Sequence, residues 1–125
     1  MSYKKMMTVC AALPFIFALA FISMPEFTTL LEFPGTEGDA LVLGITMRYL
    51  ISGTILASAF LCLMSRNVEG KNNQSSILLG ATLGFASVCI VCLLVTLNRE
   101  AFLVPPIIAT GLVSAACFWS RSKLS

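Results

Sequence analysis

Four long apolar runs alternate with short polar joints along the chain. The runs cover residues 6–24, 41–64, 77–97 and 101–119. Each run is close to the ~20 residues that a helix needs to cross a ~30 Å hydrocarbon layer. The runs are apolar on all sides, whereas membrane-spanning β-strands alternate apolar and polar residues. The pattern therefore predicts a single all-α domain, a four-transmembrane-helix bundle.

The first joint contains the pattern of a fifth, shorter helix. Pro25 suits the first turn of a helix, and Phe27, Leu30 and Leu31 follow at helical spacing. An amphipathic helix of this kind buries its apolar side in the surface of a bilayer. We therefore expect a short interfacial helix over residues 25–32, in the first outer loop.

The other two joints differ in length and in the connection that they predict. Residues 65–76 are polar and contain Gly70, which predicts a loop. Residues 98–100 are so few that the flanking helices should form an antiparallel hairpin. Pro105 and Pro106 should kink the last helix, because proline disrupts a helix interior.

Composition supports a membrane location. Hydrophobic residues make up 58% of the 125 residues and charged residues only 11%. Mean hydropathy is +0.93. A small soluble domain leaves too much of its surface in water to accommodate so many apolar side chains. The net charge of +2 is too small to indicate nucleic-acid binding, and the absence of histidine removes histidine-based catalysis and metal ligation.

The distribution of charge predicts an orientation. Basic residues concentrate at the two ends of the chain and in the second joint, whereas the first joint is acidic. The positive-inside rule therefore places both termini in the cytoplasm and predicts a multi-pass protein of the inner (plasma) membrane. The basic positions are Lys4, Lys5, Arg66, Lys71, Arg121 and Lys123, and the acidic ones are Glu26, Glu32, Glu37 and Asp39.

The N-terminal run has a second interpretation as a signal peptide. Lys4 and Lys5 resemble a charged leader, and Ala18-Leu19-Ala20 resembles a cleavage site. Apolar residues continue to Met24, beyond the length of an ordinary leader core. This length favours an uncleaved first helix, and cleavage stays an open alternative.

Arg48 is the one charged residue within the second apolar run. A charge at this depth normally faces the bundle and finds a partner. The expected partners are Glu26 and Glu100, which lie at the outer ends of neighbouring helices. Gly44 and Ser52 lie four residues before and after Arg48, and form a small, polar stripe suited to helix packing. The arginine either holds the bundle together or forms an anion or lipid-headgroup site.

A second small-residue face occurs in the third run. Gly80 and Gly84 form a G-x-x-x-G motif, which allows two membrane helices to approach closely. The motif predicts packing either within the chain or against a second copy.

Cys89 and Cys92 form a C-x-x-C motif inside the third run. Such a pair can act as a redox couple, as in membrane thiol–quinone oxidoreductases. Those enzymes need a second cysteine pair to relay electrons, and the outer joints contain no cysteine. Redox chemistry is therefore an alternative and not the favoured function.

The order of these features is similar to that of small bacterial inner-membrane proteins loosely related to the DoxX-like group. The resemblance covers nearly the whole chain but depends mainly on hydropathy. It implies a fold and a location, and it transfers no catalytic residue. The segments that carry it are Met24-Pro25-Glu26-Phe27, Met47-Arg48-Tyr49-Leu50, Ser52-Gly53 and Ser65-Arg66-Asn67.

These patterns favour a non-enzymatic membrane protein that acts as an accessory, assembly or partner- or lipid-binding bundle. A small transporter for an anionic or lipid-like ligand is the first alternative. Proton-coupled transport is disfavoured, because no apolar run contains Asp or Glu. No metal or other cofactor is expected. The bilayer is the expected partner, and a protein partner or a second copy of the chain stays open.

Overall fold

The fold consists of helices alone in the part of the chain that the computed structural model describes, residues 2–98 and 101–124. This confirms the predicted all-α class. There are five helices in these residues, and no strand. They are α1 (Tyr3–Ser23), α2 (Pro25–Glu32), α3 (Gly38–Ser65), α4 (Lys71–Asn98) and α5 (Val104–Ser122).

Prolines begin two of these helices. Pro25 is at the start of α2, whose bounds are those predicted from the sequence. Pro105 and Pro106 lie in the first turn of α5 and not in its interior, so the kink expected there was wrong. A proline in the first turn loses no hydrogen bond, since the first helical N–H groups have no partner within the helix.

Helix α4 begins earlier than its apolar run. The polar segment 71–76 was expected to belong to a loop, but it forms the first turns of α4. Gly70 precedes it with a φ of +93°, a conformation that favours glycine. The side-chain amide of Gln74 donates to the carbonyl of Val68 at 3.0 Å, and this hydrogen bond connects the turn to the first part of α4. Polar residues are tolerated in these turns because Lys71, Asn72 and Asn73 are exposed to solvent.

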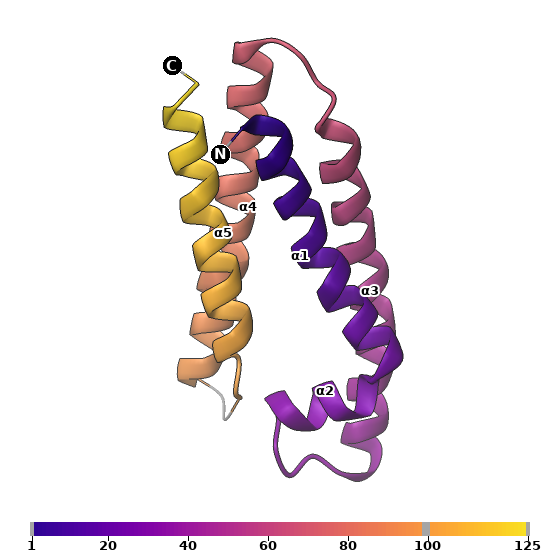
Figure 1. The fold of residues 1–125 in the computed structure, drawn as a ribbon. Coiled ribbons are helices and arrows are strands. Elements are labelled where there is room, and N and C mark those ends of the chain that lie inside the picture. Colours follow the sequence, from indigo (N-terminus) through magenta and orange to yellow (C-terminus); the bar gives the residue numbers. More distant parts are fainter. Residues whose placement is uncertain (1, 99–100, 125) are drawn as a thin grey trace.

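The helices form two groups. Helix α1 packs along α3, and α2 packs against the same pair, whereas α4 packs along α5. The α4–α5 pair is the antiparallel hairpin that the short joint predicted. Figure 1 shows the two groups diverging, with the start of α1 and the end of α5 at one end of the molecule and α2 at the other.

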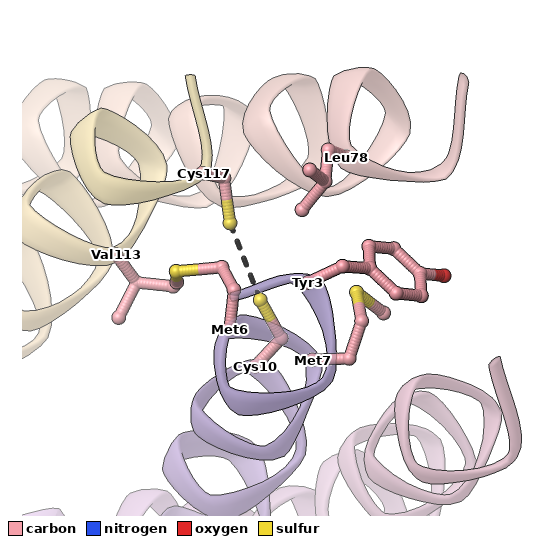
Figure 2. Close-up of a cluster of buried hydrophobic side chains, with 7 residues drawn as sticks. All are labelled: Tyr3, Met6, Met7, Cys10, Leu78, Val113 and Cys117. Atoms are coloured by element: carbon pink, nitrogen blue, oxygen red, sulfur yellow. Dashed lines mark hydrogen bonds between the residues drawn. The ribbon is translucent and has the colours of Figure 1, made fainter. Parts of the chain in front are cut away.

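A buried cluster joins the two groups at the end that holds the chain termini (Figure 2). The thiols of Cys10 and Cys117 are 3.2 Å apart, and both residues are inaccessible to solvent. The other members come from α1, α4 and α5: Tyr3, Met6, Met7, Leu78 and Val113. At the opposite end, the Phe102 N–H donates to the carbonyl of Glu32 at 2.6 Å, so a second contact lies beside α2.

Three helices, α1, α3 and α4, are long and apolar enough to cross a membrane, in place of the four that were expected. The fourth apolar run, 101–119, and helix α5 overlap but have different bounds. Helix α5 begins three residues after the start of the run and ends after the polar segment Ser120-Arg121-Ser122. This shift lowers the apolar content of α5. Large apolar side chains are nevertheless exposed along α5, including those of Ile108, Leu112 and Phe118.

Candidate functional site

An open apolar cleft of about 590 Å³ lies between the two helix groups. Its volume is within the ~300–1,000 Å³ that is usual for small-molecule sites. It extends along α3 from Arg48 to Ser65, which is about 25 Å at ~1.5 Å per residue. Most of its walls are apolar, and they include Phe17, Phe21 and Phe85. The cleft therefore has the shape and chemistry to hold a long apolar molecule.

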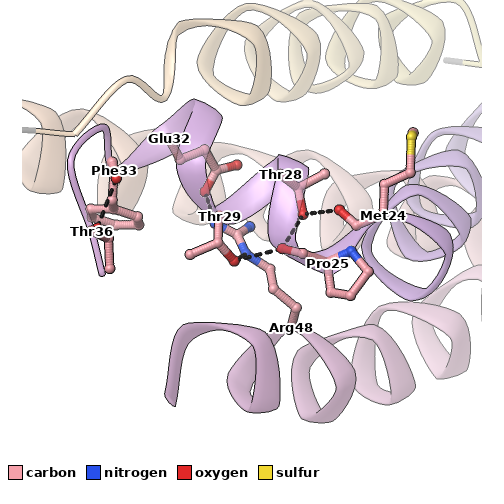
Figure 3. A network of polar contacts seen from close by, with 8 residues as sticks. All are labelled: Met24, Pro25, Thr28, Thr29, Glu32, Phe33, Thr36 and Arg48. Carbon is pink, nitrogen blue, oxygen red and sulfur yellow. Dashed lines mark hydrogen bonds and ion pairs between the residues drawn. The ribbon is translucent and has the colours of Figure 1, made fainter. Parts of the chain in front are cut away.

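The end of the cleft nearest α2 is polar, because Arg48 and Glu32 both line it. An Nη2 group of Arg48 donates to Glu32 Oε2, and the two form an ion pair (Figure 3). The Arg48 and Glu32 side chains are 9% and 13% exposed. Because both charges are largely removed from solvent, each depends on the other for compensation.

Two further contacts fix the orientation of Arg48. Its Nε–H donates to the Thr29 hydroxyl at 3.3 Å, and that hydroxyl donates to the carbonyl of Pro25 at 2.7 Å. The guanidinium carbon lies 4.6 Å from the centre of the Phe21 ring, within the range of a cation–π contact. One side chain of α3 thus contacts both α1 and α2.

The acidic partner of Arg48 is Glu32, and this corrects the expectation of Glu26. Glu26 lies in the first turn of α2 and is exposed, while Glu32 is the last residue of α2 and lines the cleft. Glu100 lies outside the described residues. No spacing in the sequence distinguishes Glu32 from Glu26, since each lies three residues from Thr29 on the same short helix. Sequence reasoning missed Glu32 because the path of α2 was unknown.

The small residues beside Arg48 lie at a close helix contact. A Cβ at Gly44 would lie 2.7 Å from the Thr29 methyl group, so only glycine lets α2 approach α3 here. Ser52 is 2% exposed, and its hydroxyl donates to the carbonyl of Tyr49 at 2.7 Å. The approach of α2 brings Thr29 and Glu32 within reach of Arg48.

Gly80 and Gly84 line the cleft and do not lie at a contact between two helices of this chain within the described residues. A Cβ at either position would have no heavy atom within 4 Å, and both glycines line the cleft. Neither glycine therefore packs against another helix within the described residues, and packing against a second copy of the chain stays a prediction. The two helix groups diverge at this level, so the small side chains widen the cleft and do not bring helices together.

The thiols of the C-x-x-C motif have different surroundings. The Cys89 thiol lies 3.5 Å from the carbonyl of Ile107 and faces α5. Cys92 lines the cleft instead. The redox alternative remains a prediction, with the two thiols directed at different neighbours.

No protein-family model, curated protein or solved structure matches the chain. The similarity to the DoxX-like group therefore stays a prediction. Among the described residues, no cluster of three or more metal-ligating side chains occurs.

Proposed function

We propose that this chain is a multi-pass inner-membrane protein that binds a lipid-like molecule in the cleft without transforming it. The observation that carries the proposal is the cleft itself, an apolar channel that ends at a buried ion pair. An amphipathic molecule would place its apolar chain along Phe17, Phe21 and Phe85 and its polar head at Arg48 and Glu32. The exposed apolar surfaces of α3 and α4 support a location in the bilayer.

The proposal includes α5 as a fourth membrane crossing. Helix α5 lies antiparallel to α4 along its length, and α4 is one of the apolar spans. Both termini then face the cytoplasm, as the basic residues predict. The polar end of the cleft is then on the outer side, where a ligand enters laterally from the bilayer.

The cleft can be filled without disturbing other contacts, because Gly84 has open space around it. In the Gly84→Leu variant, a side chain would occupy the channel, and labelling by a photoreactive fatty acid in membranes should fall several-fold. Gly53→Leu is the matched control: Gly53 also has open space, but it does not line the cleft. Labelling is quantified on the purified protein by mass spectrometry.

Equal labelling of both variants and the wild type would contradict a ligand in the cleft. Thermal melts in detergent should be similar for the three proteins, since a Cβ at either glycine has no heavy atom within 4 Å and the larger side chain extends into open space. A transport function would need an additional observation, namely movement of a labelled lipid between leaflets of a vesicle.

A further inference from the structure

The ion pair at the end of the cleft uses only part of its hydrogen-bonding capacity. The guanidinium of Arg48 donates from Nε to Thr29 and from Nη2 to Glu32. In residues 2–98 and 101–124, Nη1 of Arg48 and Oε1 of Glu32 have no hydrogen-bond partner. A donor and an acceptor are therefore left free on one largely buried pair, and both residues line the cleft.

The net charge of the pair is zero, and this restricts the head of the ligand. An anionic head would place two negative groups beside a single arginine in a poorly solvated site, which is unfavourable. An uncharged head would leave the free guanidinium and carboxylate atoms with weaker bonds, since charged partners bond more strongly. A head that carries one anion and one cation compensates both residues and leaves the site neutral.

From this complementarity we infer that the cleft takes a zwitterionic phospholipid whose head carries a phosphate and an ammonium group. This inference deepens the proposed function and rests on it. The phosphate oxygens accept from Nη1 of Arg48, a planar donor that suits phosphate. The ammonium group donates to Oε1 of Glu32. One acyl chain lies along the cleft. The other passes out through the open side of the cleft and lies in the bilayer.

The test compares phosphatidylethanolamine with phosphatidylglycerol of the same acyl chains. The full-length protein is delipidated, given both lipids in equal amounts and analysed by native mass spectrometry. Phosphatidylethanolamine should be retained about tenfold more, as expected for one additional charge-assisted hydrogen bond without a second anion. Equal retention of the two lipids by the wild type, or preference for phosphatidylglycerol, would overturn the inference without any variant.

Glu32→Gln tests whether the neutral Arg48–Glu32 pair is the reason for the preference for a zwitterionic head. Glutamine keeps the shape and the acceptor of the side chain but leaves Arg48 as an uncompensated cation, so preference should shift to phosphatidylglycerol. Glu26→Gln is the matched control, because Glu26 is exposed on the same helix and does not line the cleft. It should keep the wild-type preference, and an unchanged preference in Glu32→Gln counts against the inference.

The two proposals fail differently in these experiments. If phosphatidylglycerol is retained and Gly84→Leu removes it, the cleft binds lipid and only the zwitterionic head is wrong. If neither lipid is retained and Gly84→Leu leaves fatty-acid labelling unchanged, the proposed function itself fails. A thermal melt of each variant shows that the compared proteins are folded.

Discussion

Arg48 connects three helices from one position on α3. It contacts Phe21 of α1 through the face of the ring, and Thr29 and Glu32 of α2 through hydrogen bonds. The side chain is almost fully buried, so these contacts replace water around a permanent charge. Arg48 therefore holds α1, α2 and α3 in contact at the end of the molecule near α2.

Replacing Arg48 should destabilise the fold. Arg48→Ala leaves the Glu32 carboxylate buried without compensation, which costs about 3 kcal/mol for a broken buried pair. Arg48→Lys should recover only part of this loss, because lysine lacks the planar fork that reaches Thr29 and Glu32 together. Thermal unfolding in detergent measures both variants. Melting temperatures equal to the wild type for both would show that the pair does not stabilise the bundle.

Helices α1 and α5 are the elements that join the two groups at the end of the molecule near the chain termini. Their contact is centred on Cys10 and Cys117, which are 107 positions apart in the sequence. Apolar side chains surround both thiols, as is usual for unpaired cysteine in a core. This contact sets how far the groups can separate, and therefore the width of the cleft.

The distance between these thiols makes the contact testable. Copper phenanthroline should oxidise Cys10 and Cys117 to one intramolecular disulfide, with two electrons passing to oxygen through copper. After denaturation, two fewer cysteines should react with a maleimide, and reduction should restore both. The Cys10→Ser variant should lose no reactive thiol, provided that no other pair reacts. A full set of reactive thiols in the oxidised wild type would contradict the packing of α1 on α5.

In the part of the molecule that the structure describes, the two helix groups meet at their ends and diverge between them. The buried cluster lies at one end, and the bond between Phe102 and Glu32 lies at the other. The cleft lies in the space between the two groups and is open on part of its surface. The same divergence leaves Gly80 and Gly84 without a helix partner among residues 2–98 and 101–124.

A topology experiment distinguishes four membrane crossings from three. A fluorescent protein that matures only in the cytoplasm is fused after Leu124, and it should fluoresce if α5 crosses. The matched fusion after Asn98, which ends α4, should be dark if that end faces outward, as the positive-inside rule predicts. If α5 does not cross, both fusions report the same side.

Helix positions could be predicted from the sequence because their causes are local. Each of these causes acts over a few neighbouring residues. They are the apolar run that forms α1, the proline that begins α2 and the short joint before α5. The start of α4 was less predictable, since the turn at Gly70 and the bond from Gln74 continue the helix into polar sequence. The significance of Arg48 was also evident, because a lone charge in an apolar run requires a partner.

The identity of that partner depended on the tertiary structure. Glu26 and Glu32 are alike in the sequence, and only the close approach of α2 at Gly44 places Glu32 beside Arg48. In the same way, the motif at Gly80 and Gly84 indicates a small-residue face but not what faces it. The angle between the helix groups determines what lies opposite these glycines. That angle depends on contacts between residues far apart in the chain, such as Cys10 and Cys117, which the sequence does not reveal.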